Sequence, residues 1–326
     1  MKLIPLLQVR AQLRSGAPLP WNVRDADGKL LLARGLLVAD DAMLSSLLER
    51  GMFVDADEAR ASGRSDAVSG PAQSFFDRWN ALQARLATLL RNPGDPGFVE
   101  RIRDCTRLVA LLTERHTDPL IYAIVRHDHS RFASYGSVHS LHVAAVCSLL
   151  ARRMGWSEER HACAVCAALT MNLSIIELQG HLAARGEALT PAQREAIHVH
   201  PQASAQLLRE AGLADEAWLA AVEQHHEQPE GRGYPRGLQT PGELSQMLRY
   251  VDIFTAKHAP RAARPPLPPQ QAARELYTGS GAHPVAALLI KEFGIFPPGC
   301  FVKLSSGETA IVVRRGSSAN APLAAA

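Results

Sequence analysis

Apolar residues recur at helical spacing through the central part of the chain, from about residue 76 to residue 299. Side chains three or four residues apart share one face of an α-helix, so this spacing predicts a series of amphipathic helices. Thr190 and Pro191 start one of them well, as an N-cap residue and a proline at the first helical position. Turns are expected at Gly155, Gly180, Gly212 and 228–242. The pattern predicts a mainly α protein with a helical domain over 76–299.

The first sixty residues have a different pattern. Two segments that look like short strands, 21–24 and 30–32, flank Asp27-Gly28, a pair typical of a tight turn between strands. Helical spacing then predicts a helix over 40–50, and Phe53-Val54 could pair back as another strand. Residues 1–60 are therefore expected to form a small α/β or mostly-β module with a regulatory or interaction role.

Three shorter segments complete the predicted organisation. Residues 61–75 are rich in small and polar residues and are expected to form a linker. Two apolar runs flank a Ser-Ser-Gly-Glu turn within 300–315, which predicts a C-terminal β hairpin. Residues 316–326 are expected to be disordered.

Composition narrows the class of protein. The 326 residues are 47% hydrophobic and 21% charged, which is ordinary for a globular protein of two domains. A formal net charge of +3 is too small to argue for nucleic-acid binding. No apolar run approaches the roughly 18 residues of a membrane span, and Pro5 breaks the short apolar N-terminus. We therefore expect neither a nucleic-acid partner nor a membrane partner.

The cysteines point to the cytoplasm. They are five in number and scattered, which indicates reduced thiols rather than a disulfide framework. Cys163 and Cys166 have CxxC spacing, but they lie in an alanine-rich helical stretch with no second pair nearby. Buried small side chains are the favoured interpretation, and a redox or zinc role is the alternative.

The candidate chemistry centres on two adjacent histidines, His225 and His226, which lead into a Gly-x-Gly-Tyr-Pro turn. Imidazoles are good ligands for divalent metals, and the glycines let the backbone approach whatever is bound there. Three further candidate ligands lie on predicted helices, which hold ligands rigidly: His139, His200 and Asp252. Each residue alone is a weak signal, but together they indicate a metal site.

These motifs, in this order, resemble those of the HD-GYP family, the bacterial phosphodiesterases that open cyclic di-GMP. The family has a His-Ser segment, His-Asp-x-x-Lys, His-Pro, His-His-Glu with Gly-Tyr-Pro, and a final Asp. This chain matches every item but one over roughly 120–315. The resemblance implies an HD-type helical bundle, with metal ligands at His139, His200, His225, His226 and Asp252.

The motif that names the family is the missing item. Thr170, Met171 and Ser174 stand where the resemblance places the histidine, the aspartate and the lysine. In the family the aspartate bridges two metals that activate a shared water, and the lysine stabilises charge on the phosphoryl oxygens. A methionine thioether is a poor ligand for iron, manganese or magnesium. The glutamate that some members use for a third metal falls at Tyr135. Catalysis is therefore expected to be lost.

Part of the metal site remains. His139 and Asp252 alone would seldom hold a metal firmly. The three histidines His200, His225 and His226 could still hold one iron, manganese or zinc ion with an open position. The alternative is that they are neutral, hydrogen-bonded core residues with no metal.

Ligand binding is also implied by the resemblance. Arg261 and Arg264 lie at the spacing of the family's phosphate-binding basic residues, although they could equally be solvated loop arginines. The Gly233-Tyr234-Pro235 turn shapes the family's site and is implicated in contacts with diguanylate cyclases.

The expected function is a degenerate HD-GYP-type protein in cyclic di-GMP signalling. It would bind cyclic di-GMP or a related nucleotide, a diguanylate cyclase or other signalling protein, or both. A residual metal-dependent phosphodiesterase and a pure protein-interaction scaffold are the alternatives.

Overall fold

Two units make up the chain, Met1–Gln73 and Ser74–Ala326. Each has a hydrophobic core of its own. The computed structural model describes residues 3–13, 19–34, 48, 52–59, 74–126, 132–262, 264–316 and 321–326. The predicted helix over 40–50, apart from Leu48, and most of the predicted linker lie outside the described residues.

A four-stranded antiparallel sheet forms the described part of the first unit, in the order β1-β4-β2-β3. Its strands and the 3-10 helix η1 are β1 Leu3–Pro5, η1 Leu6–Gln12, β2 Val23–Arg24, β3 Leu30–Leu32 and β4 Phe53–Asp55. Gly28 lies in the turn between β2 and β3 with a φ of 82°, which favours glycine. Trp21, Val23 and Val54 fill the core beneath the sheet. The small strand module predicted from the sequence is confirmed.

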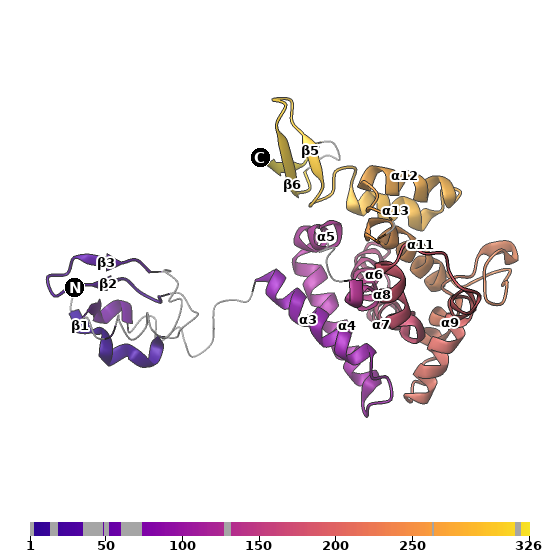
Figure 1. Ribbon diagram of the computed structural model, residues 1–326, viewed down its shortest axis with the longest axis horizontal. Helices are drawn as coiled ribbons and strands as arrows, with labels where there is room; N and C mark the ends of the chain where they lie inside the picture. The colour runs from indigo at the N-terminus through magenta and orange to yellow at the C-terminus, as the bar shows by residue number, and fades with distance from the viewer. Residues whose placement is uncertain are drawn as a thin grey trace. The chain divides into compact units, whose positions relative to one another are not determined.

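The second unit is helical, as Figure 1 shows, and the mainly α prediction is confirmed. The α-helices of its described residues are α3 Phe75–Leu90, α4 Phe98–Arg115, α5 Thr117–Val125, α6 Tyr135–Arg153, α7 Glu158–Thr170, α8 Ile176–Ala184, α9 Pro191–Glu210, α10 Glu216–Gln224, α11 Glu243–His258, α12 Pro269–Gly279 and α13 Pro284–Phe293. Short 3-10 helices join some of them, at η2 Phe132–Ser134, η3 Leu173–Ile175 and η4 Pro229–Gly231.

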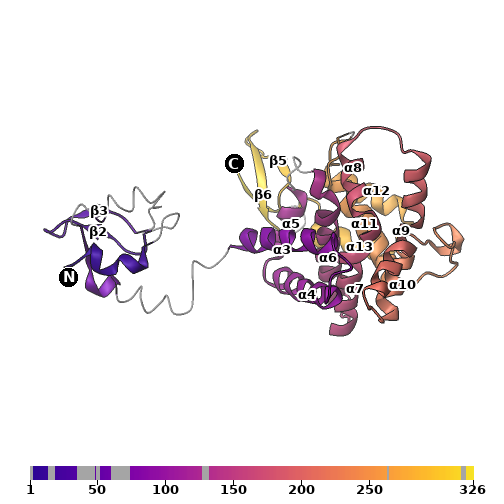
Figure 2. The same cartoon turned by 60° about the horizontal axis from the view of Figure 1, so that its bottom comes forward.

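Helix α6 runs through the middle of this bundle (Figures 1 and 2). It packs against α3, α4, α7, α8 and α11. Every residue from Tyr135 to Ala151 is buried, because the helix is largely apolar or small all round rather than on one stripe. A histidine on this helix is therefore carried into the interior of the molecule.

Helix α9 begins as the sequence predicts. The Thr190 hydroxyl accepts a hydrogen bond from the Gln193 N–H at 3.2 Å, and the Gln193 side chain accepts one from the Thr190 N–H at 2.9 Å. This reciprocal capping box stabilises the first turn. Pro201 lies inside the same helix. Because proline has no N–H, the Ile197 carbonyl four residues earlier loses its usual helical donor.

The C-terminal end forms a three-stranded antiparallel sheet, in the order β5-β6-β7. The strands are β5 Phe301–Lys303, β6 Thr309–Arg314 and β7 Leu323–Ala325. The predicted hairpin is β5 with β6. The expectation that all of 316–326 is disordered is wrong for β7, because pairing with the free edge of β6 overrides the weak strand propensity of its alanines.

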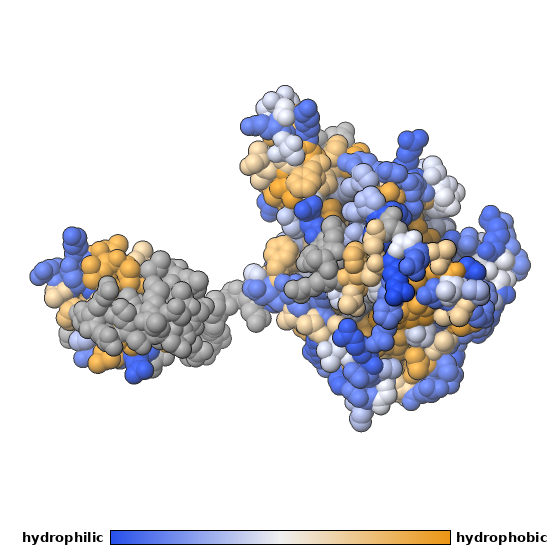
Figure 3. Space-filling model, in the orientation of Figure 1, coloured by the Kyte–Doolittle hydropathy of each residue, from blue (hydrophilic) through white to orange (hydrophobic). Residues whose placement is uncertain are grey.

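Large apolar side chains are exposed on this C-terminal sheet. Phe301, Val313 and Leu323 are 60%, 40% and 57% exposed. Figure 3 shows hydrophobic residues over the lower part of the sheet and hydrophilic residues at its tip.

One helical stretch among the described residues, Glu158–Ala184, is long and apolar enough to cross a membrane. It comprises α7, η3 and α8, and 67% of its most apolar window is buried inside the bundle. Core helices of bundles pass the same test, so this is weak evidence for a membrane span.

Candidate metal and ligand site

Four segments bring the predicted ligands into the interior of the bundle. His139 comes from α6, His200 from α9 and Asp252 from α11, while His225 and His226 directly follow α10. His200 and His225 are at most 1% exposed, and His139 is 5% exposed. These three ligands are buried, whereas His226 and Asp252 are half-buried, and the five fall into two separate groups.

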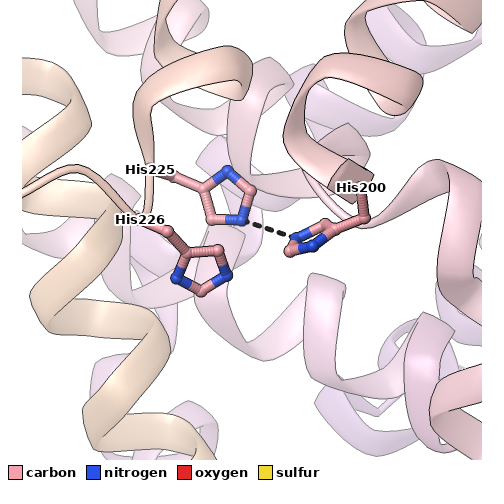
Figure 4. A group of neighbouring side chains, drawn as sticks. All are labelled: His200, His225 and His226. Carbon is pink, nitrogen blue, oxygen red and sulfur yellow. Dashed lines mark hydrogen bonds between the residues drawn. The ribbon is translucent and has the colours of Figure 1, made fainter. Parts of the chain in front are cut away.

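The first group is the cluster of His200, His225 and His226. One nitrogen from each ring lies within 4.8 Å of the other two. Figure 4 shows the rings of His225 and His226 beside each other, with His200 opposite them. The Nε2 atoms of His200 and His225 are 3.1 Å apart.

Backbone carbonyls fix the orientation of two of these rings. The Nδ1 atom of His200 lies 2.6 Å from the Ile197 carbonyl, which Pro201 leaves without a helical donor. The Nδ1 atom of His225 lies 2.7 Å from the Val222 carbonyl, in the last turn of α10, where carbonyls lack helical partners. A carbonyl only accepts, so both Nδ1 atoms carry protons and both Nε2 atoms present lone pairs.

Burial keeps these rings neutral. It lowers the pKa of His200 to about 3, assisted by the neighbouring His225 ring. Burial also lowers the pKa of His225, and lowers that of His226 well below its usual value. Neutral imidazole is the form that binds a metal.

The geometry fits one divalent ion. Two lone pairs facing each other at 3.1 Å repel unless a cation or a proton lies between them. If a neutral ring instead carried its proton on Nε2, between the two rings, its Nδ1 atom would be unprotonated. The Nδ1 lone pair would then face a carbonyl oxygen, which is unfavourable. Two nitrogens bound to a tetrahedral zinc are about 3.3 Å apart. The facing nitrogens therefore favour the metal interpretation over that of a neutral core relic.

The second group is the pair of His139 and Asp252. The Nε2 atom of His139 lies 2.6 Å from Oδ1 of Asp252. Burial raises the pKa of Asp252, but the hydrogen bond and charge of His139 outweigh it, so that the pKa falls below its usual range. The carboxylate is therefore ionised, and Nε2 of His139 and Oδ1 of Asp252 are hydrogen-bonded to each other.

Of the three residues at the family's motif positions, Thr170 and Met171 are built into the core, whereas Ser174 is exposed. Met171 has no exposed surface and belongs to the main hydrophobic cluster. The Thr170 hydroxyl donates to the Cys166 carbonyl at 2.8 Å and accepts from the Trp218 indole N–H at 2.8 Å. The Ser174 hydroxyl lies 3.0 Å from that of Ser204. All three side chains thus pack or hydrogen-bond within the fold.

A pocket of about 210 Å³ lies beside the histidines. His139, His200, His226 and Asp252 line it, and Tyr234 of the Gly-Tyr-Pro turn forms part of the same wall. The Tyr234 ring stacks on that of His226, with centroids 4.6 Å apart. Four of the five predicted ligands therefore face one cavity, and His225 lies outside its lining.

The Gly-Tyr-Pro turn is held by close backbone contact. A Cβ atom at Gly233 would lie 2.2 Å from the Gln228 nitrogen and 2.4 Å from the Glu227 Cα, so only glycine fits. Glu227 is fully buried, and its carboxylate accepts from the backbone N–H groups of Arg236 at 2.7 Å and Leu238 at 2.9 Å. Pro235, by contrast, is not among the pocket-lining residues.

The two candidate phosphate-binding arginines occupy different places. Arg261 lines the pocket, and its guanidinium donates to the Tyr135 hydroxyl at 3.2 Å. Arg264 does not line the pocket, and its guanidinium donates to the Ala256 carbonyl at 3.0 Å. Only Arg261 is positioned to meet a ligand there.

Sequence reasoning gave no binding role to Tyr135, Asn172 or Gln179, which also line the pocket. The only signal was positional. Tyr135 stacks on His139, with centroids 5.7 Å apart, one helical turn before it. Asn172 lies between Met171 and Ser174, inside the segment that aligns with the family motif.

The CxxC pair has the surroundings of buried structural thiols. Burial raises the pKa of Cys163 to about 12 and that of Cys166 to about 11. The Cys166 sulfur lies 3.1 Å from the Thr106 hydroxyl. Thiols with raised pKa values are poor nucleophiles and poor metal ligands, which favours the packing interpretation.

Comparison with known proteins gives a family match, a curated relative and a similar solved structure. The HD domain family matches residues 118–283. The cyclic di-GMP phosphodiesterase PA4108 of Pseudomonas aeruginosa is 23% identical over 249 residues, which cover 72% of this chain and 60% of that protein. The structure of Bd1817, an HDG"Y"P protein from Bdellovibrio bacteriovorus, matches with a TM-score of 0.53 at 18% identity, over 89% of this chain and 97% of that one. The family match shows that the chain belongs to the HD domain family, and the resemblance of its motifs to those of HD-GYP proteins agrees with its similarity to Bd1817.

Proposed function

We propose that this chain is a catalytically degenerate HD-GYP-type protein of cyclic di-GMP signalling. It keeps a one-metal pocket, binds the nucleotide there through a phosphate, and does not hydrolyse it. The observation that carries this proposal is Met171, buried without exposed surface where the resemblance places the bridging carboxylate. A thioether in the core cannot hold two metals together.

The loss of the second metal position supports the absence of hydrolysis. Nε2 of His139 and Oδ1 of Asp252 are hydrogen-bonded to each other at 2.6 Å, and no further carboxylate lines this pocket among the described residues. Two-metal phosphodiesterases stabilise both the attacking and the leaving oxygen. Removal of a single electrostatic donor lowers kcat by about 10²–10³ in other enzymes, so the loss of both aspartate and lysine is expected to lower it further.

Nucleotide binding is supported by what remains. His200, His225 and His226 would hold one iron, manganese or zinc ion, which when bound supplies a positive charge for a phosphate oxygen. The Arg261 guanidinium lies in the same pocket and suits a phosphate contact. At about 210 Å³ the pocket is smaller than the roughly 300–1,000 Å³ typical of ligand sites. It would therefore take one phosphodiester group, with the bases outside.

A residual single-metal phosphodiesterase is the second candidate. The three-histidine cluster favours it, because one divalent ion with an open position can lower the pKa of a bound water. The two candidates share the pocket and differ only in turnover.

One experiment separates them. Purified protein, loaded anaerobically with iron or manganese, is titrated with cyclic di-GMP by calorimetry and assayed for linear product over hours. We expect binding without product, and weaker binding in His225→Ala. Product that disappears in His225→Ala would establish the residual enzyme instead. Lack of binding at micromolar nucleotide would contradict both candidates and leave the interaction scaffold.

A further inference from the structure

Asn172 carries an amide group that the fold leaves unused. The residue directly precedes η3, yet its side chain makes no capping hydrogen bond, although asparagine is a preferred capping residue. It is 3% exposed, and its Nδ2 atom has no hydrogen-bond partner among the described residues. A buried donor without an acceptor destabilises a folded chain. The role of this amide is therefore to be sought in binding rather than in folding.

The unused amide lies on the wall of the histidine pocket. Asn172 lines the same cavity as His200, His226 and Arg261. Gln179 of α8 lines it as well, and its Oε1 atom also has no partner among the described residues. An unpaired donor and an unpaired acceptor on one pocket wall indicate a polar ligand that supplies the missing partners.

The charges around the pocket point to an anion. Arg261 is the one lysine or arginine among its described lining residues. The carboxylate of Asp252 is already paired with His139. Ser174, at the position of the family's lysine, directs its hydroxyl to the Ser204 hydroxyl and to the His200 carbonyl at 3.2 Å. Because this hydroxyl is already engaged, another residue has to donate a hydrogen bond to an anionic ligand in the pocket.

We propose that the Asn172 amide binds a phosphate-type oxyanion, which the Arg261 guanidinium contacts from the same pocket. The ligand oxygen accepts the Nδ2–H of Asn172, and a hydroxyl or N–H of the ligand donates to Oε1 of Gln179. The proposal rests on the proposed function in taking this pocket as the ligand site. Its oxyanion chemistry can be tested without the nucleotide.

The test uses two probes, inorganic phosphate and cyclic di-GMP, titrated by calorimetry into the metal-loaded full-length protein. Asn172→Leu removes the donor while keeping the branched shape of the side chain, and Asn172→Ala is the second variant. We expect both probes to bind about 10- to 100-fold more weakly, as for a lost hydrogen bond to a charged group. Metal content and Tm should not fall, because the amide makes no structural hydrogen bond.

Ser140→Ala is the matched control. Its hydroxyl is also fully buried and without a partner among the described residues, but it does not line the pocket. We expect its affinities to equal those of the unaltered protein.

The outcomes separate this inference from the proposed function. Equal affinity of the unaltered protein and Asn172→Leu for both probes overturns the inference and leaves nucleotide binding in place. Phosphate binding that needs Asn172, without any binding of cyclic di-GMP, supports the inference and removes the proposed function. If the unaltered protein binds neither probe, both fail.

Discussion

At the scale of single residues, the site is shaped by the absence of a carboxylate at Met171. Its side chain packs in the main hydrophobic cluster, next in sequence to the equally buried Leu169 and Thr170. An aspartate at this position would bury a charge, which is unfavourable unless a cation compensates it. The position can therefore report whether a metal lies nearby.

Met171→Asp is expected to lower the free energy of unfolding of metal-free protein by about 3 kcal/mol or more, the scale of an uncompensated buried charge. Added manganese should restore much of this loss if the carboxylate reaches the ion. Thermal unfolding with EDTA and with manganese measures both effects. Leu169→Asp is the control, since it should lose stability without recovery. Equal behaviour of the two variants would contradict a metal beside Met171.

The neutral histidines should make the metal-free fold sensitive to acid. Burial lowers the pKa of His200 to about 3 in the folded chain, against about 6.5 when unfolded. Between these values the unfolded chain binds more protons, so stability is fully present above pH 6.5 and is lost as pH falls below it. Each such ring contributes up to about 1.4 kcal/mol per pH unit.

Urea unfolding in EDTA at a series of pH values between 4 and 7 measures this slope. We expect His200→Asn to flatten it, because the substituted side chain does not titrate. His198→Asn, at an exposed position on the same helix, serves as the control and should keep the slope. An unchanged slope in His200→Asn would show that this ring is not buried in its neutral form.

The sequence predicts the candidate residues of this site better than their pairing. The order of motifs points to the histidines and Asp252, because ligand chemistry restricts the residue types. The direct contact of His139 with Asp252, and the division between Arg261 and Arg264, depend on how helices and loops pack. No local pattern encodes such contacts, so they could not be predicted.

At the scale of elements, the proline in α9 links helix geometry to ligand geometry. Pro201 frees the Ile197 carbonyl, and His200 donates to it through Nδ1. The defect in the helix thus orients the Nε2 lone pair, as a hydrogen bond to the other ring nitrogen does in metal-bound histidines.

Pro201→Ala should therefore weaken metal binding although it adds a helical hydrogen bond. The new N–H competes for the Ile197 carbonyl, and the His200 ring loses part of its anchor. We expect about tenfold lower metal affinity, at the lower end of the losses seen when a hydrogen-bond partner of a metal ligand is removed, measured by competition with a chromophoric chelator. Pro191→Ala is the control at the first turn of the same helix, far from the ring. Unchanged affinity in Pro201→Ala would show that the carbonyl bond does not orient His200.

Elements with a long hydrophobic pattern are predicted correctly from the sequence, whereas an element that depends on strand pairing is missed. Helical spacing predicts the bundle, and Thr190 marks the start of α9 correctly, since capping is a local interaction. Strand β7 was missed because its alanines carry no alternating pattern, and only the register with β6 makes them a strand.

At the scale of the whole molecule, the two units have separate cores. The residues that form the site all belong to Ser74–Ala326. A protein of residues 74–326 is therefore expected to fold and to keep the metal affinity of the full chain within about twofold, because affinities of independent sites change little. Metal titration and thermal unfolding of both proteins check this. A large loss of affinity would show that the first unit contributes to the site.

The hydrogen bond between Thr170 and Trp218 bears on which sequences this chain could reach by evolution. Replacing Thr170 with histidine would leave the buried Trp218 indole N–H without its 2.8 Å acceptor. It would also force a larger ring into a position with no exposed surface. An orphaned buried donor alone destabilises by about 1–3 kcal/mol. Introducing the family's His-Asp motif by single substitutions would therefore pass through less stable intermediates, so a chain under selection for stability would rarely acquire it.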